Sequence, residues 1–588
     1  MENKKEALLS LKDVEVKFKV RGRTLQAIRK VSLDIYDGES IAIVGESGSG
    51  KSVLTKTFSG MLDSNGYVSG GSIIYNDPEL SETNAKKNLM NNQIFKVALD
   101  KLNKYSKFEY GSEIYNQLKA LDEKEKSYMG LTGEEIEEIQ KKIDDLDFER
   151  VETFNKRLAL STKTDREEIA TLKAKEKDYK NQILALSKEL KEKHKQKAID
   201  YKNNTELVNQ IATERETLKA KYQEAINVEI TAEQKERNEL LAKEIVLSIA
   251  RYPLVRKGKS IVKILGLVKL AMKKGVDFTN NDVLDNLYSD VAFRVEYRGE
   301  DETMWKGYCK LDLAKFKLNS DWQQIRGAKV ATVFQDPMTS LNPILTIGKQ
   351  ITDCILKHQN LTYAEAKEKA KKLMTLVGIP NAEKRFDDYP FQYSGGMRQR
   401  IVIAIALSCE PKILICDEPT TALDVTIQAQ IIRLIKDLQK KLGFTIVFIT
   451  HDLGVVANVA DRVAVLYAGQ VVEVGEVEEV FYDPRHPYTW SLLSSLPQLS
   501  TRGEELFSIT GTPPSLYNKI VGDPFAPRNP YRMAIDYVKE PPMFKITETH
   551  YAKTWLLDPR APKVEKPKII QNLHEKLTHT VYNKESEA

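Results

Sequence analysis

The sequence predicts an α/β fold with a largely parallel sheet, interrupted by a long, mostly helical insertion. Residues 325–475 alternate short apolar strands with helical patterns, which is typical of a parallel sheet with crossover helices. Residues 8–80 read as short β segments separated by turn signals. Between these regions, residues 134–252 contain neither glycine nor proline and are dominated by lysine and glutamate. We therefore expect one α/β domain that is split in the sequence.

The expected division of the chain has four parts. Residues 1–80 and 321–480 form the two pieces of the α/β domain, and residues 81–320 form the insertion. Residues 481–588 are a proline-rich extension that is too long for a linker. A chain of 588 residues is long enough for several domains of ordinary size.

Composition excludes some classes of protein. The 89 basic and 84 acidic residues nearly cancel to +5, which argues against binding to nucleic acid. No apolar run is long enough to span a membrane, and MENKKEALLSLKD lacks the apolar core of a signal peptide. The cysteines show no metal-binding spacing, so we expect ordinary thiols in a reducing compartment. They are Cys309, Cys354, Cys409 and Cys416.

A glycine-rich turn follows the apolar run at residues 41–44 and matches the pattern G-x-x-x-x-G-K-[ST]. Its glycines allow successive backbone N–H groups to face a phosphate, and the following helix adds its positive end. Lys51 is expected to neutralise the β- and γ-phosphates of ATP, and the Ser52 hydroxyl to bind Mg²⁺. The expected nucleotide-binding residues here are Gly45, Glu46, Ser47, Gly48, Ser49, Gly50, Lys51, Ser52 and Val53.

Polar side chains follow three other predicted strands. Asp417 and Glu418 end the strand ILIC, and we expect Asp417 to hold Mg²⁺ and Glu418 to polarise the attacking water. Gln335 follows KVATVF and can offer a neutral oxygen to the metal or the water. His451 follows TIVFIT and can contact a γ-phosphate. A lone glutamine or histidine is more often structural, but both follow strands in the order that an ATPase requires.

A second phosphate-binding turn is predicted at Ser394, Gly395 and Gly396, at the start of the apolar helical run IVIAIALSC. This turn is superfluous if Lys51 already holds the phosphates of the same nucleotide. It therefore indicates a nucleotide held by another subunit.

In this order the motifs resemble the nucleotide-binding subunits of ABC transporters, over residues 8–80 and 322–480. The resemblance implies an ABC-type P-loop NTPase, with a RecA-like core, an antiparallel β subdomain and a helical subdomain. It also implies a D-loop at residues 422–424 with Asp424 near the nucleotide, and adenine stacking on Phe18. For Phe18, simple core packing is the alternative.

Several segments narrow the resemblance to the oligopeptide/dipeptide importer branch and its D-type ATPase subunit. They are QDPMTSLNP, SGGMRQR, DEPTTALDVTIQAQI and PRHPYTWSLL. This branch implies ATP and Mg²⁺ as cofactors, uptake of oligopeptides, and a peripheral location on the cytoplasmic face of the cell membrane. The implied partners are a homologous F-type ATPase subunit in a heterodimer, two transmembrane permease subunits and, indirectly, an extracellular substrate-binding protein.

Two other functions are alternatives. Close relatives import nickel or other small solutes. ATPases of chromosome maintenance and repair are also split by coiled coil, but there the coil enters after the Q-loop, whereas here it ends before Gln335.

Many relatives carry four cysteines in the C-terminal extension that ligate an iron–sulfur cluster. The matching positions in this chain are Asp523, Asn529, Asp536 and Thr554. No thiolate remains to hold a cluster, so we expect no iron–sulfur cluster and an extension folded by packing alone.

In the insertion, apolar residues recur at spacings of three and four, as at Ile136, Ile139 and Ile143, and form a helical seam. The insertion is therefore predicted to be several helices folded back as antiparallel coiled coil, with a break near residues 191–204 and disorder as the alternative. Thr132 with Glu135 and Thr231 with Gln234 fit capping boxes. Residues 255–275 form a basic amphipathic pattern, which suits either a membrane or partner surface or packing on its own domain. The insertion could be a docking arm, a membrane-contacting element or a tolerated accretion on a surface loop.

Overall fold

The computed structural model describes residues 7–158, 165–278, 280–288, 291–317, 319–420, 423–495, 509–518, 520–567 and 570. The chain forms two compact units. The first comprises residues 1–83, 291–296 and 308–588, and the second comprises residues 84–290 and 297–307. The four-part division expected from the sequence stays a prediction.

The sheet that carries most of the motifs has eight strands, in the order β13-β14-β12-β11-β3-β10-β9-β8. Its strands β3, β10, β9 and β8 are parallel neighbours, so their carboxyl ends meet at one edge. The predicted parallel sheet is therefore confirmed. The strands are β3 (Ser40–Val44), β8 (Val330–Val333), β9 (Ile413–Asp417), β10 (Thr445–Ile449), β11 (Arg462–Tyr467), β12 (Gln470–Glu476), β13 (Phe544–Lys545) and β14 (Tyr551–Ala552).

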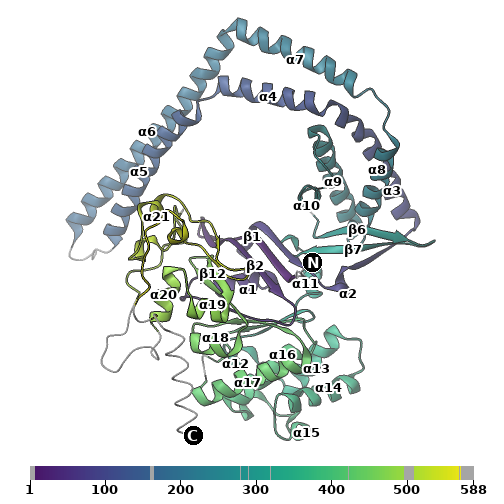
Figure 1. Ribbon diagram of the computed structural model, residues 1–588, viewed down its shortest axis with the longest axis vertical. Helices are drawn as coiled ribbons and strands as arrows, with labels where there is room; N and C mark the ends of the chain where they lie inside the picture. Colours follow the sequence, from purple (N-terminus) through teal and green to yellow (C-terminus); the bar gives the residue numbers. More distant parts are fainter. Residues whose placement is uncertain are drawn as a thin grey trace. The chain divides into compact units, whose positions relative to one another are not determined.

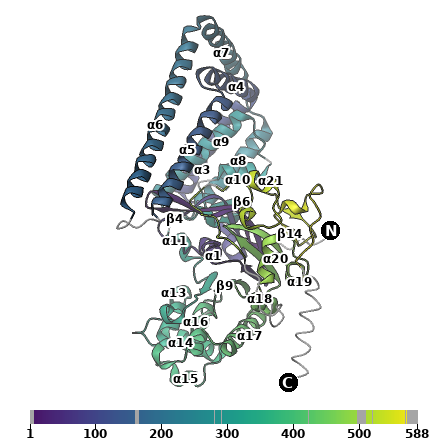
Figure 2. The same ribbon diagram turned by 90° about the vertical axis from the view of Figure 1, so that its left-hand side faces the viewer.

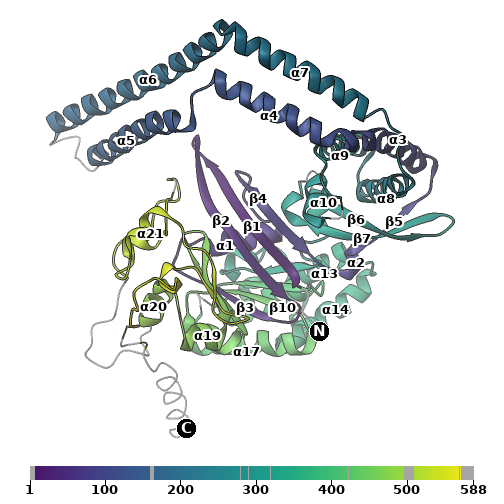
Figure 3. The ribbon, with the colours of Figure 1, turned by 45° about the horizontal axis from the view of Figure 1, so that its top comes forward.

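An antiparallel sheet supplies the other β layer, in the order β2-β1-β4-β7-β5, with β6 paired to β7. Figure 3 shows β1, β2 and β4 side by side. The hairpin between β1 and β2 turns at Arg21 and Gly22, both with positive φ, as a two-residue hairpin loop requires. The strands are β1 (Ala7–Val20), β2 (Arg23–Tyr36), β4 (Gly66–Tyr75), β5 (Glu82–Lys86), β6 (Phe293–Glu300) and β7 (Met304–Asp312).

Two helix ends in the first unit illustrate common capping signals. A capping box at Thr362 and Glu365 opens α14, and Gly443 in the left-handed region closes α17. The α-helices are α1 (Lys51–Ser59), α2 (Pro78–Ser81), α11 (Asn319–Gln323), α12 (Pro337–Ser340), α13 (Ile347–His358), α14 (Tyr363–Leu376), α15 (Ala382–Arg385), α16 (Gly395–Leu407), α17 (Val425–Leu442), α18 (Leu453–Val459), α19 (Val477–Tyr482), α20 (Pro487–Ser494) and α21 (Ala534–Val538). The 3₁₀ turns are η2 (Leu313–Lys315), η3 (Pro390–Gln392), η5 (Ala526–Arg528) and η6 (Trp555–Leu557).

The second unit is built mainly from long helices, as the sequence predicts. Both predicted capping boxes are present, at Thr132 with Glu135 and at Thr231 with Gln234. The helices are α3 (Leu89–Ser106), η1 (Lys107–Gly111), α4 (Ser112–Met129), α5 (Gly133–Leu158), α6 (Arg166–Asn203), α7 (Thr205–Ala225), α8 (Ala232–Ile249), α9 (Leu254–Lys274) and α10 (Asn281–Leu287).

Helices α5 and α6 lie side by side and antiparallel (Figures 1 and 2). Polar pairs join them along their length, and the partner number falls in one helix as it rises in the other. The pairs are Glu135 with Lys197, Glu149 with Tyr179 and Arg157 with Glu176. This is the antiparallel coiled-coil arrangement that the apolar seam of the sequence predicts.

The helical seam breaks at Asn204, which ends α6 and caps α7 by accepting a hydrogen bond from the Leu207 N–H. Helix α7 then packs along α4. Leu121, Tyr201 and Ile211 form a small apolar cluster at this junction. The break expected near residues 191–204 therefore falls at the end of that interval, where an asparagine side chain can satisfy the exposed N–H groups.

The basic helix α9 packs on its own unit through a buried apolar face. The ammonium groups of Lys269 and Lys273 lie over the ring of Phe108, 5.8 and 5.2 Å from its centroid. Among the helices that the structure describes, none is both long and apolar enough to cross a membrane. Two interpretations of residues 255–275 were open, and the structure shows the one in which this helix packs on its own domain.

Polar side chains form hydrogen bonds between α8 and α3. The Asn238 amide is fully buried and donates to Asn103 Oδ1 at 3.0 Å and to Ser106 Oγ at 2.8 Å. We expect Asn238→Leu to destabilise the second unit by about 1–3 kcal/mol, because it removes a hydrogen-bond partner of the buried Ser106 hydroxyl and of the partly buried Asn103 amide. Thermal unfolding of the full chain measures this change. Asn209→Leu, at an exposed position of α7, is the control, and equal midpoints for the two variants would contradict the prediction.

Candidate nucleotide-binding site

The carboxyl ends of the parallel strands bring the predicted motif residues into contact. Ser52 at the start of α1 donates a hydrogen bond to Asp417 Oδ1 at 3.1 Å. Gln335 Nε2 donates to Glu418 Oε2 at 3.0 Å, and His451 Nδ1 lies 3.2 Å from Glu418 Oε1. Residues from four separate segments therefore meet at one edge of the sheet.

The phosphate-binding loop between β3 and α1 depends on glycine at two close approaches. A Cβ at Gly45, where φ is +150°, would lie 2.1 Å from the Leu466 carbonyl oxygen. At Gly50, where φ is +104°, it would lie 3.0 Å from the Ala27 carbonyl oxygen. Only glycine fits both positions, so packing against neighbouring backbone fixes the shape of the loop.

The Lys51 ammonium is directed back into this loop. It donates to the carbonyl oxygens of Gly45 at 2.7 Å and of Glu46 at 3.0 Å. Burial lowers the pKa of Lys51, and the nearby carboxylates of Glu418 and Asp417 oppose that shift. A buried cation with acceptors on one side can exchange those acceptors for phosphate oxygens.

Ser52 and Asp417 have the spacing of two ligands on one Mg²⁺ ion. Adjacent oxygen ligands of an octahedral Mg²⁺, with bonds of about 2.1 Å, lie about 3 Å apart, and the Ser52 hydroxyl and Asp417 carboxylate oxygens are 3.1 Å apart. Burial raises the pKa of Asp417, while the hydrogen bond from Ser52 lowers it. The residues present therefore fit the ion that the sequence predicts.

Glu418 adopts a backbone conformation that is rare for a residue with a side chain. Its φ is +45°, and its N–H donates to the Ile449 carbonyl oxygen of β10 at 2.9 Å. Such strain persists only where surrounding contacts hold it, and it is concentrated at functional sites. In this conformation the Glu418 carboxylate lies between Gln335 and His451.

Phe18 lies within the antiparallel sheet, where Gly66 is its cross-strand partner. The ring is largely buried, and a Cβ at Gly66 would come within 2.6 Å of Phe18 Cε1. One face of the ring is thus covered by the Gly66 backbone, and adenine stacking stays a prediction.

The predicted signature and D-loop residues begin two helices. Ser394 is the N-cap of α16, and its hydroxyl accepts from the Met397 N–H at 3.4 Å. Asp424 is the N-cap of α17 and accepts from the Ile427 N–H at 3.0 Å. Ala422 lies outside the described residues. Nucleotide contacts of these two turns stay predictions.

Two contacts on the phosphate-binding loop were missed by the sequence analysis, and both come from the C-terminal extension. The Glu46 N–H donates to the Tyr488 hydroxyl at 2.8 Å. Arg528 donates to both carboxylate oxygens of Glu46, at 2.7 and 3.0 Å. These residues are separated in sequence by 442 and 482 positions. No local pattern could have paired them.

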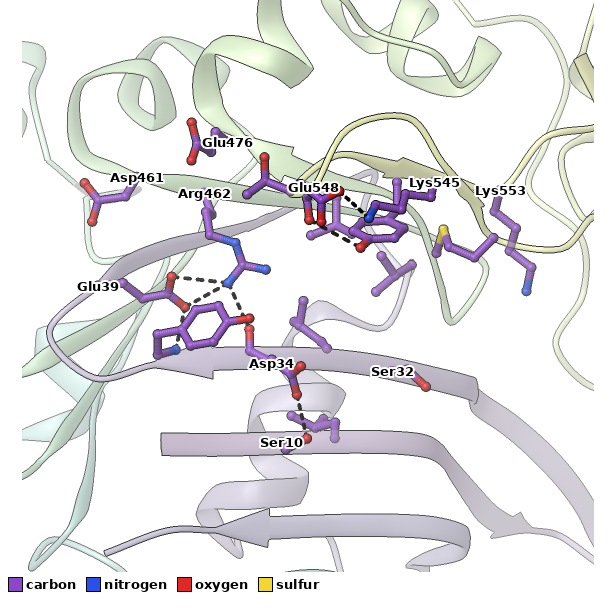
Figure 4. A pocket seen from close by; sticks show the side chains of 18 of the residues that line it. Ser10, Ser32, Asp34, Glu39, Asp461, Arg462, Glu476, Lys545, Glu548 and Lys553 are labelled. Carbon is purple, nitrogen blue, oxygen red and sulfur yellow. Dashed lines mark hydrogen bonds and ion pairs between the residues drawn. The ribbon is translucent and has the colours of Figure 1, made fainter. Parts of the chain in front are cut away.

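A cavity of about 1440 Å³ lies between the β1–β2 hairpin, β12 and the C-terminal strands (Figure 4). Some charged side chains in its wall are paired: Arg462 donates to Glu39 at 3.1 Å, and Lys545 donates to Glu548 at 2.6 Å. None of the predicted nucleotide-binding residues lines it. It is therefore separate from the phosphate-binding loop.

The four positions in the extension that match cluster ligands in relatives are all buried. Each side chain accepts a hydrogen bond from a backbone N–H nearby in sequence, so each caps a local turn. The pairs are Asp523 with Phe525, Asn529 with Tyr531, Asp536 with Met533 and Thr554 with Leu556. The chain has no cysteine after Cys416. These residues do not fit an iron–sulfur cluster.

A phosphate-binding loop and a strand ending in two carboxylates define a nucleotide-binding cassette. The model of the ABC transporter family matches residues 28–249 and 300–421, more than half of the chain. The model of the oligopeptide/dipeptide transporter C-terminal region matches residues 472–535. The chain belongs to the ABC transporter family and is an ATPase that couples ATP hydrolysis to transport, as the sequence predicts.

Curated relatives of this chain are ATP-binding proteins of peptide transport. The oligopeptide transport ATP-binding protein AmiE of Streptococcus pneumoniae is 64% identical over 283 residues, which are 48% of this chain and 77% of that protein. OppD of Bacillus subtilis, with the same description, is 60% identical over 261 residues, 44% of this chain and 73% of that protein. The dipeptide transport ATP-binding protein DppD of Lactococcus lactis is 57% identical over 266 residues, 45% of this chain and 75% of that protein.

A solved bacterial ABC transporter cassette, MJ0796, aligns with 14% sequence identity and a TM-score of 0.36 over 80% of this chain and 98% of that one. That likeness is too remote to carry an argument.

The expected heterodimer with an F-type ATPase subunit is wrong. The relatives and the matched C-terminal region imply permease partners, and they do not support an F-type ATPase subunit. The D-type assignment itself agrees with relatives named OppD and DppD. The sequence motifs identify this chain's own family, and they contain no information that identifies an F-type ATPase subunit as its partner.

The capped turns of the extension predict a pH-dependent stability. Burial, with the nearby Asp536, raises the pKa of Asp523 to about 7. Since the unfolded value is about 4, stability falls as pH rises through that interval and the buried carboxyl loses its proton. Asp523→Asn keeps the acceptor for the Phe525 N–H and removes the charge. We expect it to raise the free energy of unfolding at pH 8 by up to about 4 kcal/mol, with the gain fading toward pH 5.

Urea unfolding at pH 5 and pH 8, followed by tryptophan fluorescence, measures this effect. The matched control is Asp558→Asn, because Asp558 lies in the same extension in an exposed pair with Arg560. We expect no gain in stability from the control. The same pH dependence in wild type and Asp523→Asn would refute the assignment.

Proposed function

We propose that this chain is the ATP-hydrolysing subunit of an importer of oligopeptides or dipeptides. The observation that carries the proposal is that Ser52 contacts Asp417 and Gln335 contacts Glu418 in a chain that also has a C-terminal region shared with oligopeptide/dipeptide transporters. The names of the relatives support the same class of solute. A chromosome-maintenance ATPase would have no reason to carry that C-terminal region.

In the proposed site, the loop of residues 45–50 and the Lys51 ammonium bind the phosphates of ATP. Ser52 and Asp417 would hold Mg²⁺, which would neutralise phosphate charge when bound. Their oxygen spacing supports this assignment. The Gln335 amide nitrogen donates to Glu418, so its amide oxygen is directed elsewhere and can accept from a water or bind the ion.

Glu418 is proposed to polarise the water that attacks the γ-phosphorus. Attack forms the new P–O bond, the bond to the β-phosphate oxygen breaks, and ADP and phosphate leave. Gln335 and His451 each approach one oxygen of the Glu418 carboxylate and so fix its direction. His451 is then placed to contact the γ-phosphate.

The proposed setting is the cytoplasmic face of the cell membrane, where the chain associates with two permease subunits. Binding and hydrolysis of ATP would bias two arrangements of the segment after Gln335, and that segment would pass the change to the permeases. The signature turn at the start of α16 is proposed to bind a phosphate other than the one held by Lys51.

The two central assignments predict different losses. Glu418→Gln is expected to lower the rate of ATP hydrolysis by at least about 10²-fold, because the amide cannot polarise water as the carboxylate does, while ATP still binds. Lys51→Ala is expected to weaken binding itself. Phosphate release and equilibrium binding of ATP separate the two effects. Glu548→Gln, at an exposed position, is the control, and near-normal hydrolysis by Glu418→Gln would disprove the role assigned to that residue.

We also propose that the extension holds no iron–sulfur cluster and is stabilised by packing and turn hydrogen bonds. Protein purified without oxygen is expected to contain no stoichiometric iron and to show no visible absorption band of a cluster. About four iron atoms per chain, with such a band, would overturn this proposal.

A further inference from the structure

The C-terminal extension contacts the phosphate-binding loop at one residue, Glu46, in two independent ways. We propose that the extension positions the loop for nucleotide binding, with Arg528 and Tyr488 as positioning residues that act through Glu46. The inference rests on the proposed nucleotide site. Both residues lie within the matched oligopeptide/dipeptide transporter C-terminal region, residues 472–535.

The Arg528 contact has the geometry of a strong, directional interaction. Its two terminal nitrogens reach one oxygen each of the Glu46 carboxylate, at 2.7 and 3.0 Å. The Arg528 side chain is only 5% exposed, against 25% for Glu46, so water and salt screen the guanidinium side of the pair weakly. Burial alone would lower the pKa of Arg528, but hydrogen bonds from it to Glu46 and Tyr467 raise it overall. Arg528 therefore stays charged while it holds the loop.

The Tyr488 contact fixes the backbone of the same residue. The Tyr488 hydroxyl accepts from the Glu46 N–H at 2.8 Å, so this N–H is directed toward the extension. The ring is fully buried, and its centroid is 4.5 Å from that of Tyr467 and 5.4 Å from that of Phe525. A rigid aromatic cluster thus sets the position of one peptide unit in the loop.

Glu46, the residue that the extension contacts, is also a hydrogen-bond partner of Lys51, the cation proposed to bind phosphate. The Glu46 carbonyl oxygen accepts from the Lys51 ammonium at 3.0 Å, while the N–H and carboxylate of Glu46 are held by the extension. A displacement of Glu46 therefore moves an acceptor of Lys51. Errors of about 1 Å in such positioning are enough to weaken a site markedly.

Arg528 is itself anchored, so it transmits the position of the extension. Its Nε donates to the Thr510 carbonyl oxygen at 3.1 Å, and one terminal nitrogen donates to the Tyr467 hydroxyl at 3.2 Å. The guanidinium links the extension to the strand β11 and to the loop after β3. A change in the extension would reach the nucleotide through this side chain.

The test compares ATP affinity, KM and kcat of the purified full chain with those of Arg528→Gln, Arg528→Lys and Glu46→Gln. We expect Arg528→Gln to raise Kd and KM for ATP about tenfold with kcat changed less than about twofold, since a buried charged hydrogen bond is lost. Arg528→Lys is expected to recover part of the affinity, because it keeps the charge without the fork.

The double variant tests whether Arg528 acts through Glu46. In a Glu46→Gln background, Arg528→Gln is expected to change ATP affinity less than about twofold further, because the carboxylate it holds is already gone. Additive losses would overturn the proposal. Tyr488→Phe keeps the aromatic cluster and removes only the hydroxyl, and it is expected to raise Kd about threefold. It remains informative where Arg528→Gln fails to fold.

Arg560→Gln is the matched control, because Arg560 forms a similar forked pair with Asp558 in the same extension but is exposed. Its ATP affinity is expected to equal that of wild type. If Arg528→Gln and Tyr488→Phe bind ATP as tightly as wild type, whatever their melting temperatures, the contacts with Glu46 serve only to stabilise the fold. That result would overturn the inference. Absence of ATP binding by the wild-type chain would contradict the proposed function, and the inference with it.

Discussion

The pairing of β4 with β7 is the constraint on which the split domain depends. Ile74 lies opposite Asp312 and Tyr75 opposite Leu311, so the chain leaves the α/β domain and returns to it at neighbouring positions. To the domain, the intervening residues act as the loop of one antiparallel strand pair. The entropy of closing a loop rises only with the logarithm of its length, so a long insertion at this point costs the domain little. Strands β3 and β9 can then join the same sheet, and Ser52 meets Asp417 across 365 residues.

The sequence allowed the catalytic edge to be predicted because its chemistry lies at strand ends. Asp417, Gln335 and His451 each follow a short apolar run, and parallel strands place such residues together. The backbone conformation of Glu418 could not be predicted in the same way. Its positive φ accompanies a backbone hydrogen bond to β10 and side-chain partners that follow β8 and β10, and these tertiary contacts leave no local pattern. The ring of Phe18 is a similar case, because its cover is a glycine on another strand.

In the insertion, periodicity predicted the helices, and capping residues predicted two of their starts. The end of α6 at Asn204 is a local event, since one side chain caps the next helix, and the sequence located it only to an interval. The packing of α9 depends on which apolar face meets α3 and α8, so the amphipathic pattern left two alternatives. The extension shows the same limit: Asp523, Asn529, Asp536 and Thr554 could be named from a resemblance, but their role as turn caps appears only with the partners in place.

The ion pair between Arg528 and Glu46 is better explained as a means of positioning the phosphate-binding loop than as a source of stability. Removing both groups from water costs free energy that the attraction between them repays only in part, and buried pairs of this kind are weak sources of net stability. The burial of Arg528 makes the pair directional, because water reaches the guanidinium poorly and cannot replace the carboxylate as its partner. Hydrophobic residues could hold the extension against the sheet without this cost, as Phe525 and Tyr467 already do. The two hydrogen bonds from the Arg528 guanidinium instead fix the position of Glu46, the residue after the first glycine of the phosphate-binding loop. The affinity of the loop for a phosphate depends on that position.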